Sequence, residues 1–413
     1  MSLTLTGALL DGEIVALRCA DGRIEALGPE VQPQPGDETI AAGGAPLLPP
    51  LVNGHTHAAM TLFRGSGGDL PLMPWLEERI WPVEAKLSEE DVYWGTRLAC
   101  AEMARSGTTR FWDMYWQPRA AARAVLDAGL KAAVGAPLID LDGNSASLRE
   151  TALRSLEELA GLGPSITPAL APHAIYTVSE DSLRWIGELS RERQVPVQMH
   201  LSETEQEVED CLAAHGARPA AYLDRLGFLS ERTVLAHGVW LDEEELELIA
   251  ARGCTLVANP AANMKLAVGG VFPYPAAQAA GAAIGLGTDG AGSNDSLDLL
   301  ADLKLFALSQ KHAAGDPAAI AAADAWAVAT GARAPLLGAT ALSVGAPADF
   351  TLMRADASEL SFGELTSDLV YAAAGAAVDT VAVDGRVVVR NGQVEGLEEI
   401  VAQARERAHG LGL

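Results

Sequence analysis

Short apolar runs recur along the chain, and most are followed by a segment in which apolar residues have helical spacing. Each run ends in a polar or glycine-containing loop, which is typical of parallel strands joined by helices. Ser179 and Asp242 are suitable N-caps for two of these helices. Pro49 and Pro50 make the first run irregular, so only its last residues can pair normally. Eight runs predict an α/β fold with a closed (β/α)8 barrel: 47–52, 108–112, 132–138, 166–171, 195–199, 233–236, 255–258 and 282–286.

Both ends of the chain have a different pattern, with short strands separated by Asp-Gly or Asn-Gly pairs. Such pairs favour tight hairpin turns. We therefore predict a small β-sandwich domain from residues 1–45 and 346–413, beside a barrel domain of residues 46–345, with a final helix at 397–407. The predicted strands are 3–9, 13–18, 23–27, 350–353, 378–383 and 386–390, and the turns are at 11–12, 21–22, 384–385 and 391–392.

A long insertion, residues 58–107, separates the first two barrel strands. A segment near the carboxyl end of a barrel strand can close over a substrate. It can equally be a packed excursion that only covers the side of the barrel. The sequence leaves both interpretations open.

Composition excludes several classes of protein. The chain has 413 residues and a formal net charge of −26, which repels nucleic-acid polymers and acidic membranes. No apolar stretch is long enough to span a membrane and no signal peptide is evident, so we expect a cytoplasmic protein. The four cysteines form no CxxC pair and are expected to be buried thiols.

Five of the eight histidines stand at the predicted carboxyl ends of strands, where barrel enzymes place their catalytic groups. His55 and His57 lie two residues apart, so both side chains project to the same face. Imidazoles with a carboxylate suit Zn²⁺ or another divalent first-row ion. The remaining groups of this set end strands four, five, six and eight: His173, His200, His237 and Asp289. We expect the other three histidines on the surface: His215, His312 and His409.

The segments around these residues resemble the amidohydrolase superfamily. Within it, they are similar to the 5-methylthioadenosine/S-adenosylhomocysteine deaminase group. The similarity runs across nearly the whole chain, including the split terminal sandwich. The motifs are LVNGHTHAAMTLFRG at 51–65, HLSET at 200–204, AHG at 236–238, NPAANMKL at 259–266 and TDGA at 288–291.

The resemblance implies a role for each of these groups. One divalent metal ion, Zn²⁺ in the first instance, would bind His55, His57, His200 and Asp289. Proton transfer would fall to Glu203, His237 and Asp289. The metal would lower the pKa of water toward neutrality. Glu203 would protonate a ring nitrogen as the water attacks the adjacent carbon, and ammonia would leave an adenine-like ring.

The resemblance also implies substrate contacts. Trp75 would cover the ring and His173 would bind the substrate. Glu84 would accept hydrogen bonds from both hydroxyls of a ribose diol. Without the resemblance, Glu84 would be interpreted as a solvated helix residue.

Two departures bear on the substrate. Relatives that accept S-adenosylhomocysteine carry an arginine where this chain has Ala136, so a bidentate clamp on the substrate carboxylate is missing there. Arg149 lies near a second such position. Ala258 replaces a histidine common in relatives. We therefore expect methylthioadenosine, adenosine or another 5′-modified adenosine, rather than S-adenosylhomocysteine, as the small-molecule substrate.

Other functions stay open at this point. One alternative is an aminohydrolase or dechlorinase of another nitrogen heterocycle, such as a guanine derivative, a pterin or a triazine. A non-enzymatic barrel that serves as a scaffold is another. A binuclear site bridged by a lysine on strand four is disfavoured, since residues 165–175 contain no lysine. The resemblance also allows a homo-oligomer.

Overall fold

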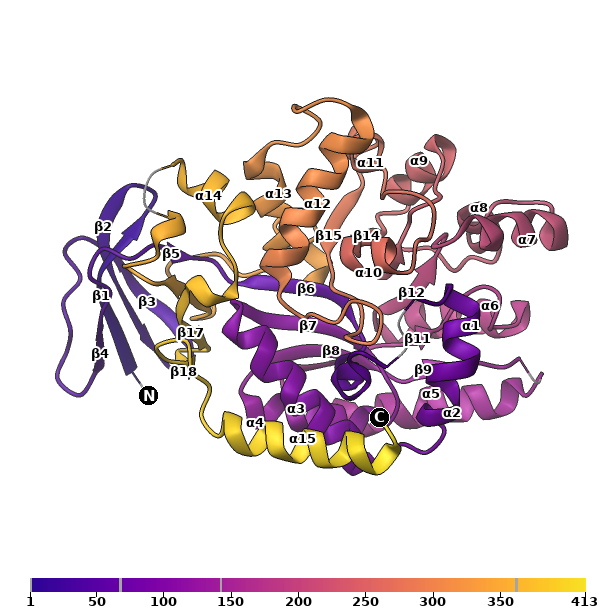
Figure 1. The fold of residues 1–413 in the computed structure, drawn as a ribbon, viewed down its shortest axis with the longest axis horizontal. Coiled ribbons are helices and arrows are strands. Elements are labelled where there is room, and N and C mark those ends of the chain that lie inside the picture. Colours follow the sequence, from indigo (N-terminus) through magenta and orange to yellow (C-terminus); the bar gives the residue numbers. More distant parts are fainter. Residues whose placement is uncertain (1, 67–68, 142, 361–362) are drawn as a thin grey trace.

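The computed structural model describes residues 2–66, 69–141, 143–360 and 363–413, and it contains a barrel with a two-sheet layer at one side (Figure 1). In those ranges, eight parallel strands are hydrogen-bonded in the order β10-β8-β7-β6-β15-β14-β13-β12. Leu170 bridges to Val197 and so joins the two end strands. This arrangement confirms the predicted (β/α)8 barrel. The strands are β6 (Leu51–Thr56), β7 (Thr108–Met114), β8 (Lys131–Gly135), β10 (Ile166–Pro168), β12 (Val197–Leu201), β13 (Thr233–His237), β14 (Thr255–Ala258) and β15 (Ala283–Leu286).

Helices surround the barrel, and the two predicted N-caps begin two of them. The Ser179 side chain accepts a hydrogen bond from the Ser182 N–H, and Asp242 forms a reciprocal capping box with Glu245. The helices between or after the strands include α3 (Glu89–Arg105), α4 (Pro118–Ala128), α5 (Ser145–Ala160), α6 (Glu180–Arg193), α7 (Glu205–His215), α8 (Pro219–Arg225), α9 (Glu243–Ala251), α10 (Pro260–Lys265), α11 (Tyr274–Ala279), α12 (Leu299–Ala314) and α13 (Ala322–Ala329).

Three of the predicted strands are divided. The first run splits into β5 (Leu47–Leu48), which pairs with β16 (Phe350–Met353) in the terminal layer, and β6 of the barrel. Pro49 and Pro50 cause this split because neither has an N–H for a sheet. The third and fourth runs continue as the short parallel pair β9 (Pro137–Leu138) and β11 (Ala171–Pro172).

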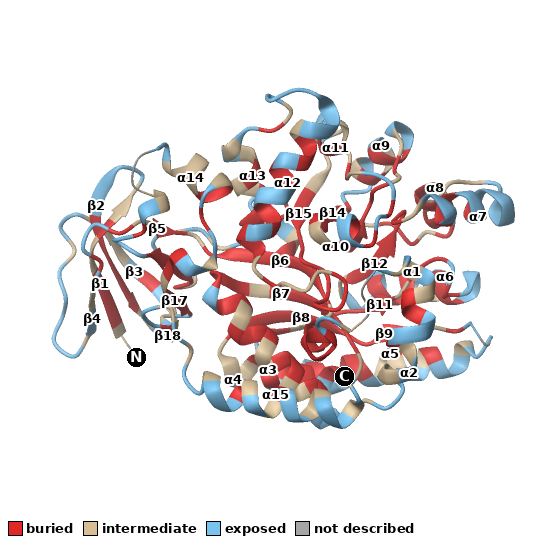
Figure 2. Ribbon diagram, viewed as in Figure 1, coloured by how far each residue is buried: buried red, intermediate tan, exposed pale blue. Residues whose placement is uncertain are grey.

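The two termini form two facing sheets, which confirms the predicted small sandwich. One sheet has the order β3-β2-β1-β4 and the other β18-β17-β16-β5. Leu5, Leu17 and Phe350 lie in their shared apolar core. Figure 2 shows buried stretches in the strands of this layer. The strands are β1 (Ser2–Leu10), β2 (Glu13–Ala20), β3 (Arg23–Gly28), β4 (Glu38–Ala41), β17 (Val378–Val383) and β18 (Arg386–Val389).

The hairpin turns of the sandwich have the expected backbone. Asp21 and Gly22 have φ values of 51° and 77°, and Asp384 and Gly385 have values of 47° and 71°. Positive φ at both central residues is the type I′ turn that Asp-Gly favours. β4 was not predicted, and it pairs in parallel with β1. The residue boundaries predicted for the two domains stay a prediction.

The two halves of the insertion between β6 and β7 lie in different places, and closure of the first half over a substrate stays a prediction. Its first half lies beside the carboxyl ends of the strands, and its last helix, α3, packs on the side of the barrel against α4 and α15 (Leu397–Leu411) (Figure 1). The first half consists of η1 (Ala58–Phe63), α1 (Leu72–Trp75), a π-helical turn η2 (Leu76–Ile80) and α2 (Trp81–Glu84).

Within the described ranges, no helix is both long and apolar enough to cross a membrane.

A buried ion cluster joins the sandwich to the barrel. Lys131 on β8 contacts Asp349 at 2.8 Å and Asp384 at 2.7 Å. Asp349 is 1% exposed, so its charge depends on this partner. Lys131 is more than two hundred positions from either aspartate in sequence, and their contact fixes how the two layers meet.

Replacing Lys131 with methionine should lower the free energy of unfolding by about 3–5 kcal/mol, because it leaves a buried carboxylate without a cation. Chemical denaturation followed by circular dichroism measures the change. The exposed Lys304 on α12 offers a matched control. Lys304→Met should change stability by less than about 0.5 kcal/mol. Equal stability of both variants would show that the cluster does not hold the layers together.

Candidate functional site

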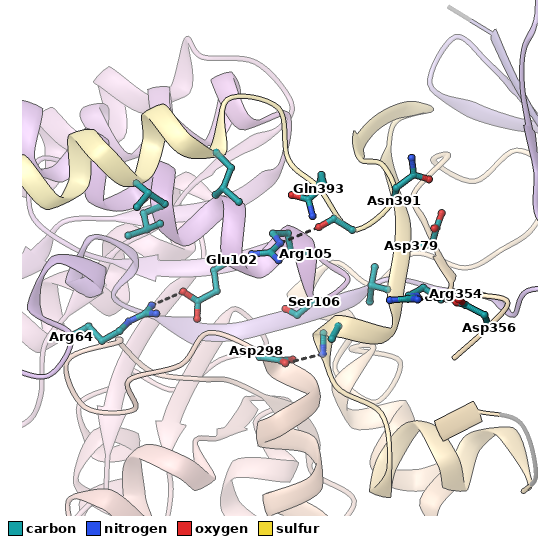
Figure 3. A pocket seen from close by; sticks show the side chains of 17 residues that line it. Arg64, Glu102, Arg105, Ser106, Asp298, Arg354, Asp356, Asp379, Asn391 and Gln393 are labelled. Carbon is teal, nitrogen blue, oxygen red and sulfur yellow. Dashed lines mark hydrogen bonds and ion pairs between the residues drawn. The ribbon is translucent and has the colours of Figure 1, made fainter. Parts of the chain in front are cut away.

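One large cavity among the described residues is not where the predicted site residues lie. It has a volume of about 910 Å³ and lies where the sandwich meets the barrel (Figure 3). Its charged side chains are paired with neighbours: Arg64 with Glu102 at 2.5 Å, and Arg354 with Asp356 at 3.0 Å. Arg105 donates to the carbonyl of Gly392. Because these charged groups are paired with one another, they are not available to bind or activate a reacting ligand.

A second cavity lies at the carboxyl ends of the barrel strands, under the first half of the insertion. His55 is fully buried and is not among the residues that line this cavity. The other predicted residues all line it: His57, Trp75, Glu84, His173, His200, Glu203, His237 and Asp289. The structure therefore brings together side chains from seven separate segments. The three histidines predicted at the surface are exposed, and all four cysteines are buried.

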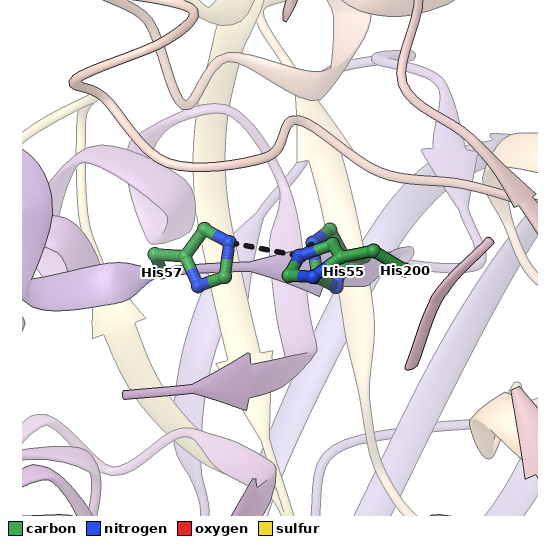
Figure 4. A group of neighbouring side chains, drawn as sticks. All are labelled: His55, His57 and His200. Atoms are coloured by element: carbon green, nitrogen blue, oxygen red, sulfur yellow. Dashed lines mark hydrogen bonds between the residues drawn. The ribbon is translucent and has the colours of Figure 1, made fainter. Parts of the chain in front are cut away.

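Three imidazoles and one carboxylate converge on a single point. The Nε2 atom of His200 lies 3.1 Å from Nε2 of His55 and 3.3 Å from Nε2 of His57 (Figure 4). Oδ1 of Asp289 lies 3.2 Å from Nε2 of His57 and 3.6 Å from Nε2 of His55. Two ligands at about 2.0–2.1 Å from one tetrahedral ion are about 3.3 Å apart. The four donor atoms therefore fit a divalent first-row metal ion.

Hydrogen bonds behind the imidazoles fix which nitrogen faces this point. The Nδ1–H of His57 donates to the carbonyl of Met114 at 2.6 Å, and that of His200 donates to the carbonyl of His173 at 2.9 Å. Both Nε2 lone pairs are thereby turned toward the cluster. Ser293 Oγ donates to Oδ2 of Asp289 at 2.7 Å, whereas Oδ1 accepts no hydrogen bond from any described residue. An unpartnered buried carboxylate oxygen is what a cation would satisfy.

The electrostatics of the cluster also favour a cation. Burial and the neighbouring imidazoles hold the pKa of His200 well below its ordinary value, so this ligand is neutral. Burial opposes protonation of His57, but its contact with Asp289 outweighs burial and raises the pKa to about 9. One positive charge is therefore stabilised next to Asp289. A metal ion at the centre of the four groups can take the place of that proton.

Two groups at the edge of the cluster can move protons. Burial, with the Asp289 carboxylate nearby, raises the pKa of Glu203 to about 8. Oε1 of Glu203 lies 3.7 Å from Nδ1 of His237. The Nδ1–H of His237 donates to Oδ1 of Asn263 at 2.8 Å, and burial lowers the pKa of this imidazole. Glu203 is therefore a proton donor near neutral pH, and His237 is neutral with Nε2 free.

Unfavourable backbone conformations gather at this site. Ser202, His237 and Asp289 have φ values of 48°, 73° and 60°. Non-glycine residues adopt this left-handed region at a cost of about 1–3 kcal/mol each, and such residues cluster at functional sites. Each of the three lies at or just after the end of a barrel strand, where the chain turns to present a polar side chain.

The predicted substrate contacts line the opposite wall of the cavity. Trp75 ends α1 and is buried, and Glu84 ends α2 and is partly buried. Burial raises the pKa of Glu84, and contacts with Trp116 and Tyr115 offset part of this effect. His173 lies next to His200, with ring centroids 4.8 Å apart, and burial lowers its pKa to about 3. It is a neutral hydrogen-bonding group.

The rest of the wall is largely apolar. Among the described residues that line the cavity, none is lysine or arginine. Arg149, which lies near a position for a carboxylate clamp, instead covers the ring of Trp185 at 5.3 Å. Ala136 is buried in the barrel. The apolar side chains of this wall include Leu72, Leu76, Ile80, Trp81, Met114, Ile139 and Leu266.

Sequence reasoning missed two residues that support the proton-transfer groups. Glu207 accepts hydrogen bonds from the N–H groups of Ser202 at 2.8 Å and Glu203 at 2.9 Å, so it holds the turn that carries Glu203. Asn263 on α10 fixes His237. For Glu207 a signal existed, because Thr204 and Glu207 have the spacing of a capping box. Asn263 lies within the NPAANMKL motif, but the motif itself does not indicate this role.

Comparisons with known proteins give a consistent result. The model of the amidohydrolase family matches residues 47–388. A 5′-deoxyadenosine deaminase of Methanoregula boonei is 46% identical over 403 residues, covering 95% of this chain and 91% of the relative. A 5-methylthioadenosine/S-adenosylhomocysteine deaminase of Archaeoglobus fulgidus is 41% identical, covering 91% and 90% of the two chains. The crystal structure of a Xanthomonas campestris adenosine deaminase with bound zinc matches with a TM-score of 0.90 and 34% identity, over 100% of this chain and 98% of the other.

Proposed function

The chain belongs to the amidohydrolase family, and on that basis we propose that it is a metal-dependent deaminase of 5′-modified adenine nucleosides. The products are the corresponding inosine form and ammonia. The observation that carries the proposal is the position of the Glu203 carboxyl. This proton donor lies beside His237 and lines the same cavity as Asp289, His57 and His200, and His55 belongs to the same buried cluster. The relatives named above act on nucleosides of this class.

We propose that the four ligand groups hold one divalent ion, with Zn²⁺ as the first choice because the donor set is three imidazoles and a carboxylate. When bound, the ion supplies Lewis acidity, which makes water a nucleophile near neutral pH. Asp289 accepts a proton from the attacking water. His237 orients this water by accepting a hydrogen bond at Nε2, because its Nδ1–H is engaged by Asn263.

Glu203 performs the complementary step on the ring. It donates its proton to a ring nitrogen, which makes the adjacent carbon electrophilic. The water oxygen adds to this carbon, and Asp289 passes the proton that it accepted to the exocyclic amine. The remaining hydroxyl proton returns to Glu203 as the carbonyl forms. The carbon–nitrogen bond breaks, and ammonia leaves. Burial supports this role because it keeps the carboxyl protonated near neutral pH, with a pKa of about 8.

The cavity wall supports a substrate with an uncharged 5′ group. The apolar side chains of the wall suit a methyl or methylthio substituent, whereas Trp75 suits the ring and Glu84 suits a ribose diol. S-adenosylhomocysteine carries a carboxylate at its far end. Since no lysine or arginine is present among the described lining residues, that carboxylate would have no cationic partner.

We therefore expect 5′-deoxyadenosine and methylthioadenosine to have kcat/KM values at least about tenfold above that of S-adenosylhomocysteine, the value of one lost charge-assisted hydrogen bond. Loss of the adenine ultraviolet band and release of ammonia measure the rates for metal-loaded protein. Equal values for all three nucleosides would contradict the proposed pocket. Absence of reaction with every adenine nucleoside would contradict the proposed function.

A further inference from the structure

Tyr115 has a buried hydroxyl in the cavity that the proposed mechanism does not use. The residue directly follows β7, where its N–H donates to the carbonyl of Gly135 at 3.1 Å. The side chain is 2% exposed and lines the cavity. Its ring centroid lies 6.3 Å from that of His57, so it lies next to the ligand cluster.

The hydroxyl of Tyr115 makes no hydrogen bond of normal length with any residue that the structure describes. A buried polar group without a partner costs free energy, so it calls for an explanation. Tyr274 shows that such a group need not be functional, because its hydroxyl is likewise buried and unpartnered. The two tyrosines differ in their positions. Tyr274 packs against Phe306 and does not line the cavity, whereas Tyr115 does.

Tyr115 lines the same cavity as the carboxylate of Glu84. The two groups are close enough to affect each other, since Tyr115 contributes to lowering the pKa of Glu84. Burial and Glu84 in turn raise the pKa of Tyr115 well above its ordinary value. The phenol therefore keeps its proton and can act as a donor, whereas an ionised carboxylate can only accept.

A hydroxyl group of the substrate can form hydrogen bonds with both the Tyr115 phenol and the Glu84 carboxylate. It can donate its proton to the carboxylate and accept a hydrogen bond from the phenol at the same time. Resting on the proposed function, we propose that Tyr115 is a further substrate-binding residue, which donates a hydrogen bond to one hydroxyl of the ribose diol that Glu84 accepts from. Glu84 and Tyr115 thereby recognise the ribose together. A substrate without that hydroxyl leaves the Tyr115 hydroxyl without a hydrogen bond.

Tyr115→Phe removes only the hydroxyl and tests this inference. We expect kcat/KM for adenosine to fall by about fivefold to twentyfold, the value of one neutral hydrogen bond to a bound substrate. Metal content and the midpoint of thermal unfolding should not change. The penalty should disappear for either the 2′-deoxy or the 3′-deoxy form of adenosine, and this result would also identify the hydroxyl that is bound.

Tyr274→Phe is the matched control, and its kcat/KM should equal that of the wild type for all three nucleosides. An unchanged kcat/KM for Tyr115→Phe would overturn the inference, as would an equal penalty for adenosine and both deoxy forms. If the wild-type protein deaminates no adenine nucleoside, the proposed function fails instead. The two failures are therefore distinguishable within one set of measurements.

Discussion

Glu203→Gln is expected to lower kcat for 5′-deoxyadenosine by about 10³-fold or more. The amide keeps the size of the side chain and its ability to form hydrogen bonds, but it has no acidic proton to give to the ring. General acid–base groups contribute about 10²–10⁴-fold to rates. In this mechanism Glu203 activates the ring for attack, so an effect near the upper end is expected. Single-turnover kinetics with metal-loaded protein would measure it.

Glu205→Gln is a matched control, because Glu205 is an exposed carboxylate two residues after Glu203, at the start of α7. Its kcat should stay within about twofold of the wild type, as for an ordinary surface substitution. The metal content of the Glu203 variant should equal that of the wild type. A Glu203→Gln protein that retains most of its activity would assign proton donation to another group.

Removal of the metal is expected to abolish activity, and reloading with Zn²⁺ should restore it. The reason is that no other described group in the cavity can activate water as strongly at neutral pH. His57→Ala should also lose metal and activity, because it removes one of the four converging ligand groups. Metal analysis by mass spectrometry, together with the deamination rate, would follow both quantities.

His312→Ala, a change at an exposed histidine on α12, controls for the loss of an imidazole. It should keep about one metal ion per chain and full activity. Activity that survives complete removal of metal would contradict the proposed role of the ligand cluster. Two ions per chain would contradict the proposal of a single ion.

Much of the barrel could be predicted from the sequence because its signals are local. Each strand is a short apolar run that ends in a polar loop, and each histidine of the cluster stands at such an end. Since all parallel strands of a barrel end at the same face, this placement predicts that the side chains meet. Likewise, Asp21-Gly22 and Asp384-Gly385 predict their turns because the pair itself favours positive φ.

Features that depend on contacts between distant segments were not predictable in this way. β5 joins the terminal layer because Phe350–Met353 offers it an edge, and this edge lies some three hundred residues away in sequence. The importance of Glu84 arises from its place over the cavity, since its local sequence is that of a helix exposed to water. Tyr115 carries no local signal at all, and the motif that contains Asn263 does not indicate its role. Asn263 acts on His237 and Tyr115 lies near Glu84, and both of these residues come from other elements.

The most direct test of the central claim is deamination of 5′-deoxyadenosine by metal-loaded protein in water enriched in the heavy isotope of oxygen. Mass spectrometry of the purine product, with an assay for ammonia, reports both halves of the reaction. We expect one heavy oxygen atom on the ring carbon that loses nitrogen, and one ammonia for each product molecule. Intact substrate after incubation with protein that holds its metal would contradict the claim that this chain is a hydrolytic deaminase of adenine nucleosides.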